Sequence, residues 1–234
     1  MAAIIKREFN AYFRSPLGYV FIAVYLFFSA TYFNEILTLG MASQFPQIYY
    51  GMFTIILLLL PLLTMRLMSE DKKLKTDQLL LTSPVSVPSL VLGKFFAATA
   101  VYSICVAFTI VYGIVFSFFT DPGWGMIIGN VVGAILFGAA FIAIGILISS
   151  LTESMVIAAM GTFVVSAVFI LLDVLPSTTD SKVLDFLVKW VSFVARYTPF
   201  TKGLMDVSSI IFFLSIVAVF LFLSVRVIES KRWR

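Results

Sequence analysis

The chain contains no histidine and only one cysteine, and both absences restrict what it can do. A Ser–His–Asp triad is impossible without His, and a zinc site lacks the clustered Cys and His that it needs. The single thiol, Cys105, lies in an apolar run and cannot form a disulfide within the chain. We therefore expect a protein that is not an enzyme and that has no metal or other cofactor.

Charged residues are also scarce. Only 12% of the residues are charged, 61% are hydrophobic, and the mean hydropathy is +1.08. A typical soluble domain has roughly 25% charged residues. So few charges cannot cover a surface that faces water, and the apolar residues come in long runs. These features predict an integral membrane protein whose solvent is the lipid bilayer, and they do not indicate a nucleic-acid partner.

A phosphate-binding loop is missing as well, since such a loop is a Gly-rich turn that ends in Gly-Lys-Ser/Thr. The only Gly-Lys pair, Gly93-Lys94, is followed by Phe95. We interpret Lys94 as an anchor in the membrane interface at the start of a helix. Charges lie only at the ends of the apolar runs, which argues against an ion relay. Energy for uphill transport would therefore have to come from a partner protein.

Long apolar windows predict six transmembrane helices, because about 20 helical residues cross a bilayer core of about 30 Å. The runs are too long for barrel strands and do not alternate in polarity. Pro61 predicts a kink in the second helix. We expect an all-α protein with one transmembrane domain, residues 1–234. The windows are residues 17–33, 49–65, 95–120, 123–152, 154–172 and 207–225.

The cations predict an orientation. If both termini are cytoplasmic, twelve of the sixteen Lys and Arg residues lie on the cytoplasmic side, in residues 1–16, 66–94 and the tail after 225. This matches the excess of positive charge that cytoplasmic loops carry. The other four lie in the long loop before the last window, where the rule is weakest: Lys182, Lys189, Arg196 and Lys202.

Two further segments are amphipathic, residues 4–14 and 182–196. Each is typical of a helix in the membrane interface, and each can alternatively be the end of a membrane helix. In the first, Ile5, Phe9, Tyr12 and Phe13 share one face, and Lys6, Arg7, Asn10 and Arg14 share the other. In the second, a polar stripe follows helical spacing on an otherwise apolar helix: Lys182, Asp185, Lys189, Ser192 and Arg196.

Gly125, Gly129 and Gly133 are four residues apart and therefore share one face of the fourth predicted helix. Small residues in this spacing let a second helix approach closely in a membrane. The approaching helix can belong to the same chain or to another subunit, and the sequence leaves both alternatives open.

The loop of residues 65–94 contains a dense charge run at 70–75 followed by a short apolar segment. Asp77 is typical of a helix start, and Ser83-Pro84 of a helix end. A helix this short is marginal in water, so we expect it to dock either on the membrane surface or on a partner protein. Its residues are Thr76, Asp77, Gln78, Leu79, Leu80, Leu81, Thr82 and Ser83.

Two stretches resemble the permease subunits of type-2 ABC transporters, and the gliding-motility-associated branch in particular. They are KREFNAYFRSPLGYVFIAVYLFF, residues 6–28, and TMRLMSEDKKLKTDQLLLTSPVSVPSLVLGKFFAA, residues 64–98. The resemblance implies a bacterial inner-membrane protein that pairs with a second copy or a homologous permease. It also implies separate ATP-binding cassette ATPase subunits that dock on a coupling helix.

In this sequence the resemblance places the coupling helix at residues 76–83, an amphipathic connector helix at 4–14, and an outer helix within 182–196 between the fifth and sixth spans. The match departs from the family at two positions. Lys75 and Gln78 stand where many relatives have a glycine and a glutamate. We therefore expect the permease subunit of an ATP-driven exporter. The alternative is a membrane anchor or sensor that recruits a cytoplasmic protein and transports nothing.

Overall fold

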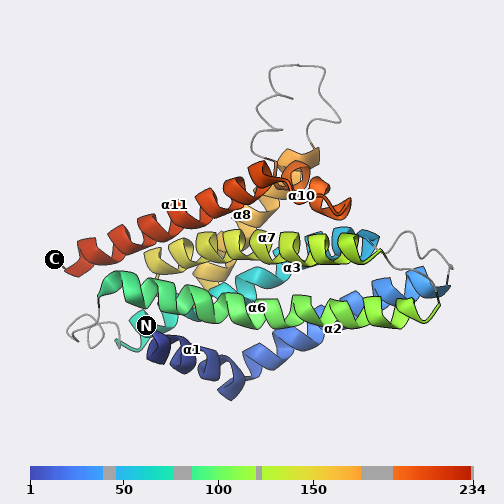
Figure 1. Cartoon of the computed structure of the whole chain (residues 1–234). Helices are drawn as coiled ribbons and strands as arrows, with labels where there is room; N and C mark the ends of the chain where they lie inside the picture. The colour runs from blue at the N-terminus through green and yellow to red at the C-terminus, as the bar shows by residue number, and fades with distance from the viewer. Residues whose placement is uncertain (39–45, 76–85, 120–122, 175–191, 233–234) are drawn as a thin grey trace.

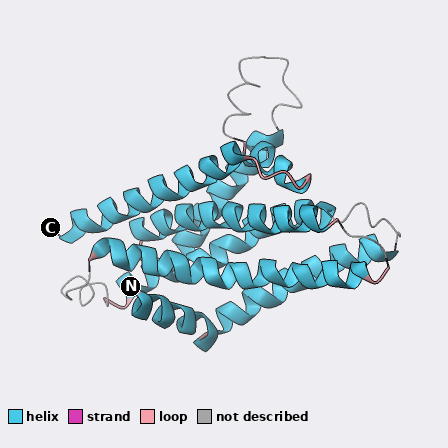
Figure 2. Cartoon of the chain, viewed as in Figure 1, coloured by secondary structure: helices cyan, strands magenta, loops and turns pink. Residues whose placement is uncertain are grey.

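The computed structural model describes residues 1–38, 46–75, 86–119, 123–174 and 192–232. Over these residues every regular element is a helix, and no strand is present (Figure 2). The prediction of an all-α protein is confirmed for this part of the chain. The helices are α1 (Ala2–Arg14), α2 (Pro16–Thr38), α3 (Pro46–Thr64), α4 (Arg66–Lys73), α6 (Val87–Ser117), α7 (Trp124–Leu151), α8 (Met155–Val174), α10 (Phe193–Thr201) and α11 (Val207–Arg232).

Five helices in the described residues are long and apolar enough to cross a membrane. They are α2, the continuous stretch of α3 and α4, α6, α7 and α11. The window predicted at residues 154–172 corresponds to α8, whose apolar part, Met155–Leu171, is shorter. The chain is therefore a multi-pass membrane protein, and the sixth span stays a prediction.

The long helices form a bundle in which both termini lie at the same end (Figure 1). The start of α6 and the end of α7 lie at this end too, as the colour gradient shows. The cation-rich segments that the sequence assigned to one side of the membrane are therefore gathered at one end of the bundle. The assignment of that end to the cytoplasm stays a prediction.

Helix α7 forms the centre of the bundle. It packs against α3, α4, α6, α8, α10 and α11, and 67% of its most apolar window is buried, against 22% for α2 and α11. Its many Gly and Ala residues make this possible, because association in lipid depends on close packing. A Cβ on Gly138 would overlap the ring of Tyr102 in α6, and one on Gly145 would overlap Thr64 in α3.

Large apolar side chains remain exposed on the outer faces of the bundle, chiefly on α8, α11, α2 and α6. Such a continuous apolar surface would be unfavourable in water and is typical of contact with lipid or with another membrane protein. This surface supports the choice of lipid as the solvent. Examples on α8 and α11 are Val156, Met160, Phe163, Leu171, Ile211, Leu214 and Phe222.

Two pairs of polar side chains in the spans join neighbouring helices. The Tyr49 and Thr109 hydroxyls lie 2.8 Å apart and join α3 to α6, and those of Ser29 and Tyr112 lie 3.0 Å apart and join α2 to α6. Because lipid offers no hydrogen-bond partners, a polar group in a span has to be satisfied inside the bundle. These pairs fix the positions of α2 and α3 relative to α6.

We predict that Gly138→Ala destabilises the fold by about 1–3 kcal/mol, because the added methyl group meets a ring that cannot move away. Tyr102 is fully buried, and its hydroxyl donates a 3.0 Å hydrogen bond to the carbonyl oxygen of Ala134. Gly125→Ala in the same helix is the control, since its Cβ would meet nothing within 4 Å. Thermal unfolding in detergent measures both variants, and equal midpoints would contradict this packing.

Candidate functional site

The candidate site consists of the polar contacts around α4 and the start of α6, at the end of the bundle that holds both termini. The predicted coupling helix, residues 76–83, lies between these two helices in the sequence but outside the described residues. Its structure and contacts therefore stay a prediction. The described residues on either side show what this segment is attached to.

The structure corrects the interpretation of Lys94 as an anchor in the membrane interface. Helix α6 begins at Val87, ahead of the predicted window, so Lys94 lies about two turns inside the helix. Its side chain is only 2% exposed, and its Nζ lies 2.6 Å from Asp71 Oδ2 and 3.3 Å from Glu8 Oε2. Lys94 is thus a buried ion-pair partner of α4 and α1 and not an anchor in the membrane interface.

Helix α1 shows the division of faces that the sequence predicted. Tyr12 is buried, and Ile5, Phe9 and Phe13 are partly buried, while the polar residues of the opposite face are exposed: Lys6, Arg7, Asn10 and Arg14. The sequence missed Glu8, which faces the bundle with a side chain only 13% exposed. The hydrogen bond to Glu8 raises the pKa of Arg7. The connector role of α1 stays a prediction.

Tyr12 and Arg66 connect α1 to the second span. The Tyr12 hydroxyl donates a 2.7 Å hydrogen bond to the carbonyl oxygen of Leu63, and burial raises its pKa, so it remains a donor. The Arg66 guanidinium lies over the Tyr12 ring, donates to Ser15 Oγ at 2.5 Å and pairs with Glu70 at 2.9 Å. Helix α1 is therefore held against the end of this span that continues into α4.

The first turn of α4 is capped by a residue of another helix. Met65, at the α3–α4 junction, gives no side-chain cap. Instead, the backbone amides of Met68 and Ser69 both donate to Ser149 Oγ of α7 at 3.0 Å, and that hydroxyl donates to the carbonyl oxygen of Met65 at 3.2 Å. Met65 itself keeps helical dihedral angles (φ −56°, ψ −33°), and its amide donates to the carbonyl oxygen of Pro61 at 2.9 Å, so the chain stays helical from α3 into α4. The kink predicted at Pro61 itself stays a prediction.

Lys72 adds a second tie between α4 and α7. Its ammonium donates to the carbonyl oxygen of Ser150, in the last turn of α7. A cation is favourable there because the carbonyl end of a helix carries a partial negative charge. Helix α4 is therefore bound to α7 on one side and, through Asp71, to α6 on the other.

The opposite end of the bundle contains α10, which overlaps the predicted outer helix only at residues 193–196. Residues 182–191 lie outside the described residues. Phe193, Tyr197 and Phe200 of α10 are buried, and the Phe193 ring lies 4.9 Å from that of Phe141. Ser192 is buried and caps α10 by accepting the Ala195 amide at 2.9 Å. The described part is thus a packed helix rather than one lying on the surface.

The glycine row of α7 meets this same helix in part. A Cβ on Gly133 would lie 2.7 Å from the ring of Phe200, and one on Gly129 would lie 3.0 Å from the carbonyl oxygen of Phe200. Both close approaches are within the chain. Gly125 has nothing within 4 Å of such a Cβ, so at this position the alternative of a second subunit stays open.

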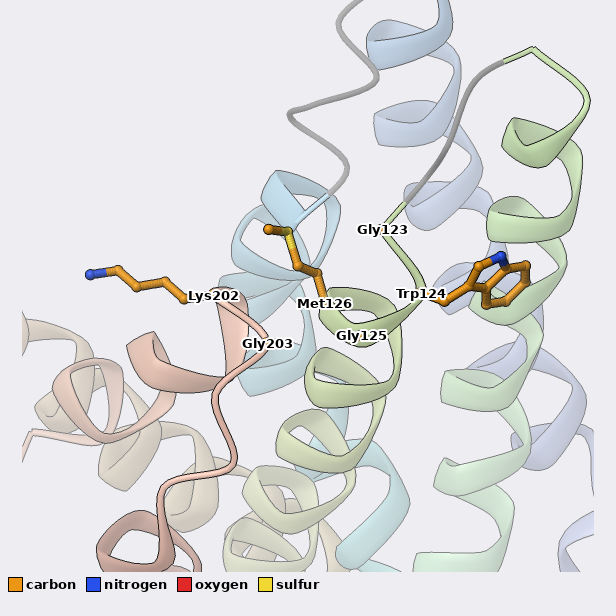
Figure 3. A pocket seen from close by; sticks show the side chains of 6 residues that line it. All are labelled: Gly123, Trp124, Gly125, Met126, Lys202 and Gly203. Atoms are coloured by element: carbon orange, nitrogen blue, oxygen red, sulfur yellow. The ribbon is translucent and has the colours of Figure 1, made fainter.

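Gly125 borders a hollow of about 430 Å³ between the start of α7 and the turn after α10 (Figure 3). The backbone of Gly123, Gly125 and Gly203 forms much of its wall, and the Lys202 side chain extends away from Met126. Lys202 is the one charged residue among those that line this hollow. Among the residues that the structure describes, no group of Asp, Glu or Cys side chains could hold a metal ion.

A comparison with protein families gives one match. The family model described as "ABC-2 family transporter protein" matches residues 34–229, which is most of the chain. A comparison with curated proteins gives no match.

We predict that Ser149→Ala destabilises the bundle by about 1–3 kcal/mol, because it leaves the buried amides of Met68 and Ser69 without their acceptor. Ser215→Ala is the control, since Ser215 is exposed and bonds only within α11. Thermal unfolding in detergent reports both effects. A midpoint for Ser149→Ala as high as that of the control would show that the cap on α4 does not contribute.

Proposed function

The chain belongs to the ABC-2 family of transporter proteins, and from this membership we propose that it forms the transmembrane pathway of an ATP-driven exporter. The family is a membrane transport component that associates with ATP-binding cassette ATPase subunits. The match over residues 34–229 is the observation that carries the proposal. ATP is hydrolysed in the partner, and the permease contributes the passage through the membrane.

The coupling site of this proposal is residues 76–83. In the sequence this segment lies between α4 and α6, and buried polar contacts join both helices to the rest of the bundle. A force applied to the segment would therefore be transmitted to α7 through Ser149 and to α1 through Lys94. The family match and the short apolar stretch after Asp77 support this placement.

The proposed topology has six spans, with both termini in the cytoplasm of a bacterial cell. Termini at the same end of the bundle require an even number of crossings (Figure 1), which favours counting α8 as a span. The 20 residues of α8 extend about 30 Å at 1.5 Å each, enough for the bilayer core. The gliding-motility-associated branch remains the specific family assignment that we propose.

We further propose that the single domain, residues 1–234, pairs with a second copy or a homologous permease. Membership of the family supports pairing, and the apolar outer faces of α8 and α11 offer surface for it. The alternative of an anchor or sensor would also use a docking loop, but a transporter family match over most of the chain does not favour it.

We predict that a double variant, Asp77→Ala with Leu80→Ala, abolishes the stimulation of the partner ATPase by the permease, because it removes the start and the apolar face of the coupling helix. The measurement is ATP turnover of the complex purified from native membranes and reconstituted in lipid. Lys202→Ala with Leu204→Ala, two exposed residues at the other end of the bundle, is the control. Unchanged stimulation in the first variant, with normal insertion, would overturn the coupling role.

The topology can be tested with single cysteines in a Cys105→Ala background, because the chain has no other thiol. We predict that a membrane-impermeant maleimide added to intact cells labels Leu204→Cys but not Lys6→Cys. Both side chains are exposed in the folded chain, so only the membrane distinguishes them. Labelling of Lys6→Cys in intact cells would refute a cytoplasmic N-terminus.

A further inference from the structure

We propose that Lys94 is a positioning residue that joins α1 to both helices flanking the coupling segment, so that these three helices move as one unit. The family match assigns no role to this residue, and the sequence pattern indicated only an anchor in the membrane interface. The inference rests on the proposed function only for the source of the movement. The joint itself is a property of the permease alone.

The side chains of Lys94, Asp71 and Glu8 form an ionic cluster where three helices meet. The ammonium of Lys94 in α6 lies between two carboxylates from different helices, at 2.6 Å from Asp71 in α4 and 3.3 Å from Glu8 in α1. The three side chains are 2%, 19% and 13% exposed, respectively. Helix α4 ends at Lys73, shortly before the coupling segment of residues 76–83, and α6 starts at Val87, shortly after it. One buried charge therefore bridges both flanks of the segment and the connector helix.

The charges of the cluster balance one another. Arg7 pairs with Glu8 at 2.5 Å, so the cluster is a row of alternating signs, from Arg7 through Glu8 and Lys94 to Asp71. The row is neutral as a whole, but no inner member can be removed without leaving a charge uncompensated. Removal of one partner from a buried ion pair is strongly destabilising, whereas replacement of all partners by uncharged residues of similar volume that pack well is often nearly neutral. The cluster therefore defines geometry more than it adds stability.

Helices α1 and α6 pack closely beside the cluster. Gly93 precedes Lys94, and a Cβ at Gly93 would lie 2.7 Å from Cγ2 of Ile4 in α1. The backbones of α1 and α6 therefore approach closely at the same level as the ion pairs. Close packing restricts the movement of α1 across α6. The Glu8 carboxylate, which pairs with Lys94, fixes the position of α1 along the axis of α6. Both restraints are needed for α1 to follow α6 as a rigid body.

The cluster differs from an ordinary surface ion pair. Arg226 and Glu229 in α11 also pair, at 3.5 Å, but their side chains are 66% and 36% exposed and belong to the same helix. Such pairs contribute little and join nothing. Arg226→Met therefore provides a matched control for Lys94→Met, since each removes one cation and introduces the same side chain.

The test measures the distance between α1 and α4 in the full-length permease in lipid nanodiscs. Spin labels are attached to Asn10→Cys and Lys73→Cys, both exposed positions, in the Cys105→Ala background, and pulsed EPR gives the distance distribution. We expect one narrow distribution in the parent and in Arg226→Met, and its loss in Lys94→Met. A narrow distribution retained in Lys94→Met would overturn the proposal.

A neutral triple variant, Glu8→Gln with Asp71→Asn and Lys94→Met, separates positioning from general stability and applies even if Lys94→Met alone does not fold. We expect its thermal midpoint to return toward that of the parent, while the narrow distribution stays lost. Recovery of both the midpoint and the narrow distribution would show that the charges serve stability alone, and would overturn the proposal.

The same variants, measured for ATPase stimulation in the reconstituted complex, connect the joint to coupling. We expect stimulation to be lost in the triple variant and kept in Arg226→Met. If no ATPase subunit co-purified with the parent permease, the proposed function would fail. The distance measurement would still decide whether Lys94 positions the three helices. Full stimulation in a triple variant whose helices have separated would overturn the role in coupling.

Discussion

Lipid cannot supply hydrogen bonds, and this constraint determines most of the structure. Every backbone group in a span has to be satisfied inside a helix, so the apolar runs become helices. The polar side chains among them have to bond to the backbone of their own helix, as Thr64 does, or to a neighbouring helix. The hydroxyl pairs of Tyr49 with Thr109 and Ser29 with Tyr112, and the ionic cluster at Lys94, meet this requirement. The sites where helices are joined are thus also the sites where polarity is buried.

The same constraint explains the role of α7. Between helices in lipid there is no hydrophobic driving force, so association depends on close contact. Gly133, Gly138 and Gly145 provide it by letting Phe200, Tyr102 and Thr64 approach the α7 backbone. A helix built from small residues can therefore contact most of its neighbours at once, and it connects the two ends of the bundle.

The sequence predicted those features that depend on local pattern. Apolar run length predicted the helices, and the spacing of Phe9, Tyr12 and Phe13 predicted the inner face of α1. Tertiary partners were not predictable, because they come from distant parts of the chain. Nothing near Lys94 in the sequence indicates that Glu8 and Asp71 surround it, and an ammonium next to an apolar run is more typical of the interface. The sequence pattern predicted a short docking helix at residues 76–83, but its coupling role comes from the family resemblance, since that function depends on another protein.

Ser149 couples the position of α7 to the backbone of α4. The amide of Ser69 is bonded to a hydroxyl 80 residues away in the sequence, and the same hydroxyl donates to the carbonyl oxygen of Met65. An axial shift of α7 would withdraw this hydroxyl from both amides that it accepts and leave them without that acceptor. The two helices are therefore restrained to shift together, and one small side chain in the central helix carries that restraint.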